Sequence, residues 1–317
     1  MMDQHKLKGK ARWQRTWRVA RRQWQLHVFM AIPVIWLLIF HFIPLYGIQI
    51  AFRDYRPLTG ITGSPWVGLK WFKQFLSYYD FWRIFGNTAI LSLYSLSTFP
   101  LPIIFALIIH AMRSERYGKL IQTVSYVPHF ISMSVMVGII QMILSPVSGI
   151  YGNLFRLFGG VGYPVDFRAS AAAFRHIYVW SGVWQSLGWS AIIYSAALSA
   201  VSQELHEAAQ IDGASRLKRM WHIDIPAIMP TIGIQFILRC TSIISVGFEK
   251  VYLLQTTLNK PVSEVISTYV YNVGMASFRS FSYGAAVGLF NTVINLTLLF
   301  IANFSVKKAT DGEISFF

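Results

Sequence analysis

Six long apolar stretches constrain the folding of this chain more than any other feature of its sequence. They lie at about 28–51, 84–111, 120–144, 176–201, 229–252 and 282–304, and each is as long as the roughly 20 residues that a helix needs to cross a bilayer. Hydrocarbon offers no water to backbone N–H and C=O groups, so a spanning segment must satisfy them internally. The sequence therefore predicts an all-α integral membrane protein with six transmembrane helices.

Composition supports this class of protein. Charged residues make up 13% and hydrophobic residues 54% of the 317 positions, whereas a soluble domain carries about 25% charged residues. The formal net charge of +15 would suit a nucleic-acid partner, but Lys and Arg gather in the first 26 residues and beside apolar stretches. Orientation in the membrane and anionic lipid explain such charge, so we expect a lipid bilayer and no nucleic acid. The single Cys240 cannot form an internal disulfide.

The flanking segments divide the chain into three predicted parts. Residues 1–26 have Trp13, Trp17 and Trp24 on one helical face and basic residues on another, which predicts an amphipathic helix in the cytoplasmic membrane interface. A transmembrane domain is expected over 27–306, with a short tail at 307–317.

The distribution of basic residues predicts the orientation of the chain in the membrane. Lys and Arg are more numerous on the side that holds both termini, the 112–119 turn and the 203–228 loop. The positive-inside rule therefore predicts that this side is cytoplasmic.

A polar segment separates the fourth and fifth apolar stretches. Glu207, Ala208 and Ala209 predict a helix with a face of small residues, against which another backbone could come close. Asp212 and Gly213 signal a turn after this helix, because glycine tolerates the left-handed backbone on which a helix stops.

A second short helix is expected after that turn. It starts near Arg216, presents Met220 and Trp221, and is expected to end at Pro226. Apolar side chains on a loop outside the membrane suggest that a protein partner covers them.

The spacing of this segment resembles the EAA loop of binding-protein-dependent ABC importer permeases. The matching positions are Glu207-Ala208-Ala209, Gly213, Ile223 and Pro226, with Ile225 where leucine is usual. The resemblance implies that the loop is a coupling helix seated in a groove of a cytoplasmic ATPase subunit, with Glu207 as a charged contact. It also implies the type I importer permease fold.

Shorter stretches resemble the branch of that family that imports oligosaccharides and polysaccharides, including alginate-type importers. They are Ser64-Pro65-Trp66-Val67-Gly68-Leu69, Phe52-Arg53-Asp54-Tyr55, Phe85-Gly86-Asn87-Thr88 and Tyr126-Val127-Pro128-His129-Phe130-Ile131-Ser132. The resemblance extends from about residue 28 to the end of the chain.

Polar residues within the apolar stretches are candidates for the substrate path, because charges there are costly. Arg239 either contacts a sugar or pairs with a group on a neighbouring helix. Asn291 and Asn295 share a helical face with Gly284 and Gly288, and either join helices or line a polar path.

Other residues of the apolar stretches are assigned by their position. Gln185, Trp189 and Tyr194 could bond to sugar rings or stack on them, or could be ordinary core residues. Glu249 and Lys250 are interpreted as interfacial. No metal site is expected, since His110, His129 and His176 lie near the ends of the stretches and lack metal-ligand spacing.

The resemblance implies a permease subunit of an ATP-driven importer that moves a carbohydrate into the cytoplasm across a bacterial inner membrane. Its implied partners are a second, homologous permease, two ATPase subunits and an extracytoplasmic solute-binding protein. No phosphate-binding loop is present, so the chain is not expected to be an enzyme, and ATP and Mg would bind the partner ATPases.

Three alternatives remain. A permease for a non-sugar solute would share the same fold. An ion-coupled carrier would need carboxylates within the spans, and an intramembrane enzyme would need convergent catalytic groups. Apart from Glu249, the apolar stretches offer neither.

Overall fold

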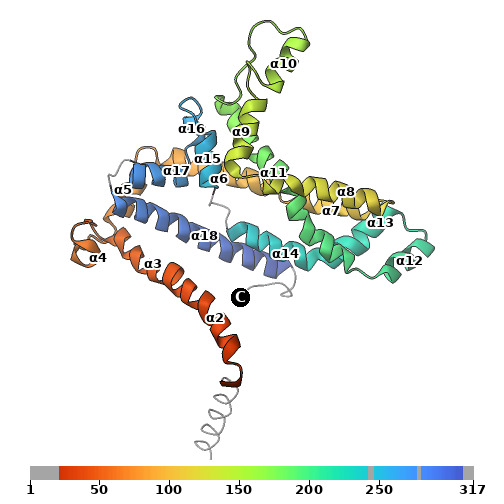
Figure 1. Ribbon diagram of the computed structural model, residues 1–317, viewed down its shortest axis with the longest axis horizontal. Helices are drawn as coiled ribbons and strands as arrows, with labels where there is room; N and C mark the ends of the chain where they lie inside the picture. Colours follow the sequence, from red (N-terminus) through yellow and green to blue (C-terminus); the bar gives the residue numbers. More distant parts are fainter. Residues whose placement is uncertain (1–20, 242–245, 277–279, 310–317) are drawn as a thin grey trace, which may run out of the picture. The chain divides into compact units, whose positions relative to one another are not determined.

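The computed structural model describes residues 21–241, 246–276 and 280–309 (Figure 1). Regular structure in these ranges is entirely helical, so the predicted all-α class is confirmed for them. The chain divides into two compact units, Met1–Gly68 and Leu69–Phe317. The amphipathic helix predicted at 1–26 lies almost wholly outside the described residues, and so does the tail beyond residue 309.

The first unit is dominated by an apolar helical segment, Trp24–Phe52, long enough to cross a membrane. It consists of α2 (Trp24–Leu37), the π-turn η1 (Leu38–Phe42), α3 (Ile43–Leu45) and the 3₁₀ segment η2 (Tyr46–Phe52). Pro44 lies in the first turn of α3, directly after the π-turn. Proline removes one backbone donor, and a local π or 3₁₀ adjustment lets the remaining donors find partners.

Two of the short stretches singled out in the sequence meet after this helix. The backbone N–H groups of Asp54 and Val67 donate to the carbonyls of Pro65 and Phe52, at 2.9 and 2.8 Å. The rings of Phe52 and Trp66 stack with centroids 5.5 Å apart, and Arg53 Nη1 donates to the Ser64 carbonyl at 2.8 Å. Helix α4 (Gly60–Gly63) lies between the two stretches.

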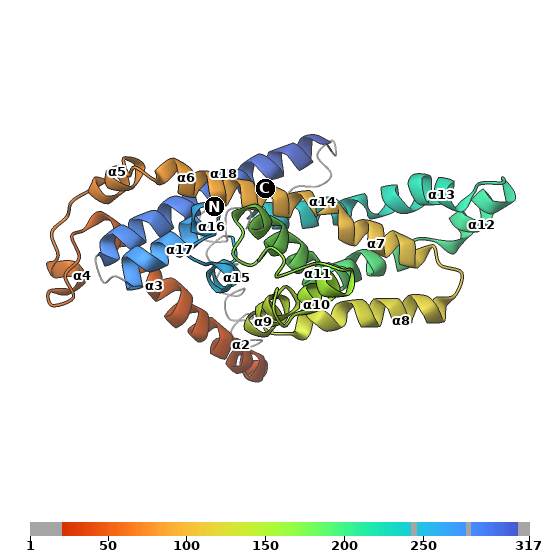
Figure 2. The same ribbon diagram turned by 90° about the horizontal axis from the view of Figure 1, so that it is seen from above.

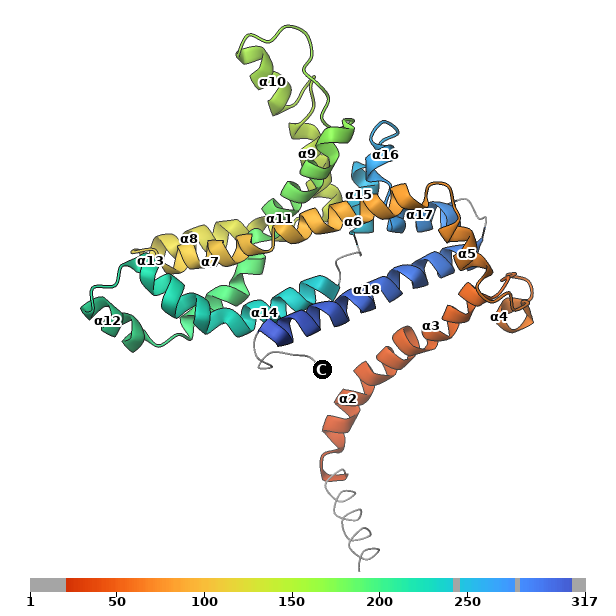
Figure 3. The same ribbon diagram turned by 180° about the vertical axis from the view of Figure 1, so that it is seen from behind.

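The second unit holds the remaining helices (Figures 1 and 3). They are α5 (Lys70–Leu76), α6 (Phe81–Ser97), α7 (Pro100–His110), α8 (Glu115–Tyr126), η3 (Val127–Phe130), α9 (Met133–Ile143), α10 (Ile150–Leu157), α11 (Ala171–Ser199), α12 (Gln203–Ile211), α13 (Arg216–Arg219), η4 (Met220–Asp224), α14 (Ile225–Thr241), α15 (Phe248–Leu254), α16 (Lys260–Ser263), α17 (Ile266–Tyr271), η5 (Asn272–Ala276) and α18 (Phe281–Ala309).

Among the described residues, four helical segments are long and apolar enough to cross a membrane: Trp24–Phe52, Phe81–His110, Arg216–Cys240 and Phe281–Lys308. A fifth is possible if the pair Glu115–Phe130 and Met133–Ile143, bent by 102°, forms one broken span. Helix α11 is long enough but is not among them. The six-span count therefore stays a prediction.

Three of the expected single spans are interrupted in the structure. In 84–111 the interruption is the two residues Thr98 and Phe99 between α6 and α7, and the segment is still one apolar run. The stretch 120–144 breaks at η3, where Pro128 cannot donate a backbone hydrogen bond, and Ser132 caps the following helix by accepting from Val135 N. The stretch 229–252 is also wrong as one helix, because α14 ends at Thr241 and α15 begins at Phe248.

Helix α11 is central to the second unit, where it packs against α7, α8 and α14. One apolar core forms along it, with Ala191 and Leu198 of α11 against Ala106 of α7 and Ile228 of α14. A second core gathers Phe75, Ile84, Ile266 and Val287 from α5, α6, α17 and α18. These contacts join segments that lie far apart in the sequence.

Gly188 allows α11 and α8 to approach each other closely. A Cβ built on Gly188 would lie 2.4 Å from the carbonyl carbon and oxygen of Ser125, and 2.6 Å from Tyr126 N. Backbone atoms cannot move aside as a flexible side chain can, so even a methyl group forces the two helices apart.

We expect Gly188→Ala to destabilise the protein by about 1–3 kcal/mol, which is the usual cost of overpacking. The matched control is Gly86→Ala in α6, where a Cβ meets nothing within 4 Å. There, alanine should be neutral or stabilising by up to about 1 kcal/mol, because it is the better helix former. Thermal unfolding in detergent measures both variants. Equal midpoints for the two would contradict the close packing of α11 on α8.

Candidate functional site

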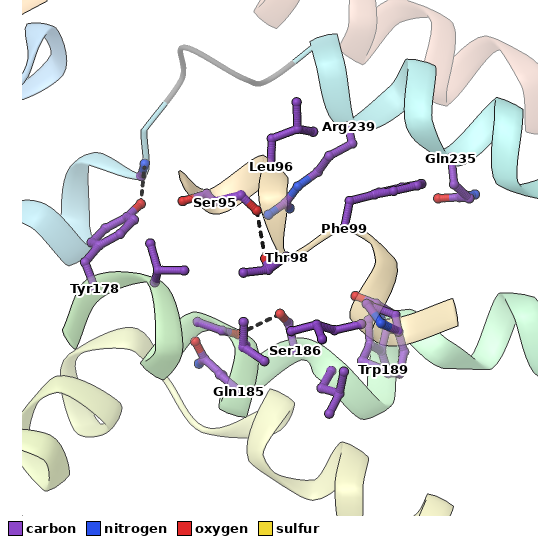
Figure 4. A pocket seen from close by; sticks show the side chains of 18 of the residues that line it. Ser95, Leu96, Thr98, Phe99, Tyr178, Gln185, Ser186, Trp189, Gln235 and Arg239 are labelled. Atoms are coloured by element: carbon purple, nitrogen blue, oxygen red, sulfur yellow. Dashed lines mark hydrogen bonds between the residues drawn. The ribbon is translucent and has the colours of Figure 1, made fainter. Parts of the chain in front are cut away.

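A cavity of about 720 Å³ lies where α6, α7, α11, α14 and α15 come together (Figure 4). One wall is the break between α6 and α7, which contributes Ser95, Thr98 and Phe99. Helix α11 forms the opposite wall. The break exists because Pro100 and Pro102 begin α7, and proline is suited to the first turn of a helix.

Hydroxyl, amide and aromatic groups line much of this cavity. They are Ser92, Ser95, Thr98, Tyr178, Gln185, Ser186, Trp189, Ser190, Tyr194 and Gln235. Several hydroxyls donate to carbonyls of their own helix, as Ser186 Oγ does to Gly182 O at 2.7 Å, so their lone pairs remain as acceptors. The lining is suited to a solute that carries many hydroxyl groups.

Arg239 reaches the cavity from the end of α14, with its side chain directed towards Ser95 of α6 (Figure 4). The sequence singled out this residue because it is a charge within an apolar stretch. The structure places it at a polar cavity. Whether it contacts a substrate stays a prediction.

Lys250 is a second cation at the same cavity, and here the sequence interpretation was wrong. It was expected to be interfacial, yet its exposed fraction is 5%, and it lines the cavity from α15. Its Nζ donates to the Tyr178 carbonyl at 2.6 Å and lies 4.6 Å from the centre of the Tyr178 ring. Lys250 lies in the first turn of α15, a helix separate from α14, and hydropathy along the sequence does not reveal that separation.

Among the described lining residues there is no Asp or Glu, so the described lining contains two cations and no carboxylate. We therefore expect Lys250→Met to leave the thermal midpoint unchanged or to raise it, since burial of a charge is costly and methionine fills a similar volume. The same change should lower transport. The control is Lys73→Met, which replaces an exposed lysine on α5. A large loss of stability in Lys250→Met alone would contradict this assignment.

Gln185 and Trp189 line the cavity and also contact the segment that separates α8 from α9. Gln185 Nε2 donates to the Ile131 carbonyl at 2.9 Å, and the Trp189 indole stacks on His129 with centroids 4.5 Å apart. The two side chains thus connect α11 to the segment 127–132.

Asn291 and Asn295 are not among the residues that line this cavity. Their helix α18 packs along α14 and α17, which suits the alternative that the pair joins helices. Gly284 packs closely against η5, since a Cβ there would lie 3.1 Å from the Gly274 Cα. Gly288 has open space at the corresponding position.

The polar segment folds into a helical hairpin at one end of the second unit, with α12 at its tip (Figure 2). Ser202 caps α12, and Ser215 caps α13 by accepting from Lys218 N at 3.4 Å. Gly213 has φ +75°, and the Ala214 N–H donates to the Ala209 carbonyl at 2.8 Å. The predicted turn at Asp212-Gly213 is therefore present, because glycine accepts the left-handed conformation that ends α12.

Pro226 does not end the second helix as expected. The segment Arg216–Cys240 is one continuous helical run, with Pro226 in the first turn of α14, directly after the π-turn η4. The π-turn shifts the hydrogen-bond register, so the missing proline N–H is tolerated.

The hairpin exposes a set of polar and apolar side chains. Glu207, Ala208 and Asp212 are exposed, and Ala209 is half-buried. Trp221 is 64% exposed, but Met220 packs against the core formed by α7, α11 and α14, so its expected outward position was wrong. Ile211 and Leu217 were not among the residues expected to meet a partner, although their exposed fractions are 87% and 66%. An apolar side chain directly before Asp-Gly could have signalled Ile211.

Comparison with known proteins identifies the class. Residues 99–310 match the family described as "Binding-protein-dependent transport system inner membrane component". This match covers more than half of the chain and contains both the hairpin and most of the cavity lining. The chain belongs to this family, whose members are permease subunits of ABC transporters.

Similar individual proteins include two from Bacillus subtilis (strain 168). Protein LplB is 40% identical over 289 residues, which cover 91% of this chain and 90% of LplB. The polygalacturonan/rhamnogalacturonan transport system permease protein YteP is 39% identical over 288 residues, which cover 90% of this chain and 89% of YteP.

Two solved structures have the same type I ABC permease fold. One is of a bacterial ABC transporter involved in the import of the acidic polysaccharide alginate, with a TM-score of 0.84 and 35% identity over 93% of this chain and 99% of that chain. The other is of a bacterial alginate ABC transporter in complex with an alginate pentasaccharide-bound periplasmic protein, with a TM-score of 0.84 and 34% identity over 95% and 99% of the two chains.

Proposed function

We propose that this chain is the permease subunit of an ABC importer for acidic oligosaccharides or polysaccharide fragments. The observation that carries the proposal is the cavity, which has Arg239 and Lys250 in its lining and no carboxylate among its described lining residues. The names of YteP and of the alginate transporter point to the same class of substrate.

The cavity offers what an anionic sugar requires. An arginine guanidinium binds a carboxylate through two parallel N–H···O bonds, and a lysine ammonium acts as a compact positive charge. Serine, threonine and glutamine side chains bond to sugar hydroxyls, while the face of the Trp189 indole that His129 leaves uncovered stacks on a pyranose ring. In a site shielded from water these interactions are stronger than at the protein surface.

The topology that we propose has six spans, with α11 and the bent pair α8–α9 completing the set. Both termini and the hairpin lie in the cytoplasm, and the protein resides in a bacterial inner membrane. Support comes from the distribution of Lys and Arg. A reporter fused to the C-terminus should give a cytoplasmic signal, and an extracytoplasmic signal would overturn the orientation.

The transport cycle that we propose needs other chains: a second permease, two ATPase subunits that hold ATP and Mg, and a solute-binding protein. The loaded binding protein docks on the outer side. Closure of the ATPases pushes on the exposed face of the hairpin, which is continuous with α14 through η4. Because Arg239 is on α14, motion of the hairpin changes the cavity wall directly.

Uptake measured in cells tests the substrate class. A strain that lacks this chain should lose uptake of a labelled uronic-acid oligosaccharide and recover it on complementation. The matched probe is a neutral oligosaccharide of equal length, whose uptake should be unchanged. If the deletion removes uptake of the neutral sugar alone, the cavity serves neutral carbohydrates and the acidic assignment is wrong.

Purification from native membranes through a tag on this chain tests the assembly. An ATPase in a ratio near two to one with this chain, together with a homologous permease, supports the importer. Recovery of this chain alone after crosslinking would favour an ion-coupled carrier instead.

A further inference from the structure

Three side chains able to ligate a metal meet at the base of the hairpin. His110 is the last residue of α7, His206 lies in α12, and Asp224 is the last residue of η4. One ligand atom from each lies within 4.8 Å of the others. In the sequence, His110 lacks metal-ligand spacing to His129 and His176, so no metal site was expected there. His206 and Asp224 come from segments that only the fold brings near His110.

The three groups are arranged around one carboxylate oxygen. Asp224 Oδ1 lies 3.1 Å from His206 Nε2 and 4.0 Å from His110 Nε2. The two imidazole centroids are 6.1 Å apart. The side chain of Asp224 is 8% exposed and that of His206 12%, whereas that of His110 is 34% exposed. The site is therefore closed on the side of the core and open beside His110.

Two of these buried atoms lack a hydrogen bond. Within the described part of the chain, neither His206 Nε2 nor Asp224 Oδ1 has a hydrogen-bond partner, although their separation meets the distance of an ion pair. A buried carboxylate oxygen without a partner is costly. The nearby arginines bond elsewhere, Arg216 to the Ala111 carbonyl and Arg219 to the His206 carbonyl. A cation placed between the two imidazoles and the carboxylate would satisfy both atoms.

We propose that His110, His206 and Asp224 form a binding site for a divalent transition metal ion, for which Zn²⁺ is the best representative. Two imidazole nitrogens and one carboxylate oxygen suit Zn²⁺, and the exposed side leaves a fourth position for water. Calcium and magnesium are disfavoured because they prefer oxygen ligands.

The distances fit a tetrahedral ion after a small adjustment. Bonds of about 2.0–2.1 Å place tetrahedral ligand atoms about 3.3 Å apart. The pair from Asp224 and His206 is already at 3.1 Å. His110 must approach Asp224 by about 0.7 Å and His206 by up to about 1.5 Å, which its partly exposed side chain at the end of α7 permits.

A bound ion would fasten α12 to the end of α7 and the beginning of α14. The proposed function implies that the hairpin transmits motion from the ATPases. In that case the ion would restrict movement of α12 relative to α7 and α14 and would slow transport. Binding itself does not depend on that function, so a failure of transport and a failure of the metal site can be told apart.

The test is metal binding by the purified transporter assembly in detergent, stripped with a chelator and equilibrated with ZnCl₂. At micromolar ZnCl₂, the number of Zn²⁺ ions bound per copy of this chain should be higher by one in the wild type than in His206→Gln. Affinity in His206→Gln should fall by at least about 100-fold, because loss of a ligand exceeds the roughly 10- to 100-fold effect of altering its supporting contacts. The matched control is His222→Gln, an exposed histidine of the same hairpin whose Nδ1 lies 2.9 Å from the Lys218 carbonyl.

Two additional measurements guard against a folding defect in His206→Gln. His110→Gln changes a more exposed ligand on another helix and should also lose the ion. Substitution with Co²⁺ should give the visible absorption of a tetrahedral nitrogen–oxygen site in the wild type and in His222→Gln only. Equal Zn²⁺ binding by the wild type, His206→Gln and His110→Gln, or no binding by the wild type, would overturn the proposal.

Discussion

Gly213→Val should abolish most transport while the transporter still assembles. Gly213 has φ +75°, a conformation that costs an ordinary L-residue about 1–2 kcal/mol and a β-branched residue more. At 1.4 kcal/mol for each factor of ten, we expect uptake to fall by about tenfold or more. A Cβ on Gly213 meets nothing within 4 Å, so the effect arises from the backbone and not from a steric clash.

The same geometry supplies a matched control. Asparagine adopts the left-handed conformation far more readily than valine, so Gly213→Asn should keep most of the uptake. The measurement is uptake and ATPase activity of the assembled transporter in vesicles. In the valine variant, ATP hydrolysis should continue, but addition of substrate should no longer increase its rate. If valine and asparagine variants transport alike, the turn does not set the position of the coupling hairpin.

Arg239→Ala should reduce uptake of an acidic oligosaccharide and spare assembly. A hydrogen bond to a charged group contributes about 1.5–3 kcal/mol, which corresponds to about a 10- to 150-fold loss in the ratio of maximal rate to KM. The uptake of Arg239→Lys should lie between that of the wild type and that of Arg239→Ala, since lysine keeps the charge but cannot form two parallel hydrogen bonds to a carboxylate. The reason is the position of Arg239 in the lining of the cavity, whose described residues include no Asp or Glu.

The comparison between substrates separates a substrate contact from a structural role. If an acidic and a neutral oligosaccharide of equal length are both substrates, only uptake of the acidic one should fall steeply in Arg239→Ala. An equal loss for both, or failure of the complex to assemble, would make Arg239 a residue that holds helices together. Gln235, one turn earlier on α14 and also at the cavity, is the control position, and Gln235→Ala should affect both sugars alike.

The part of the site that could be predicted from sequence is the hairpin. Its signals are local: Ser202 and Ser215 cap helices within three residues, and Gly213 ends α12 through bonds to residues at most five positions away. Met220 was placed on the wrong side, because in a helix interrupted by the π-turn η4 the faces shift relative to a regular period.

The sequence by itself determined that the chain is helical, apolar enough for a membrane, and provided with an EAA-type turn, because periodicity, length and cap residues act over a few positions. Only the tertiary structure decided which polar groups meet. Lys250 reaches Tyr178 across 72 positions, and His110 meets Asp224 across more than a hundred. These contacts depend on the interruptions before α9 and between α14 and α15, and on the close packing of α11 at Gly188. Such features arise from backbone contacts between segments that are distant in the sequence.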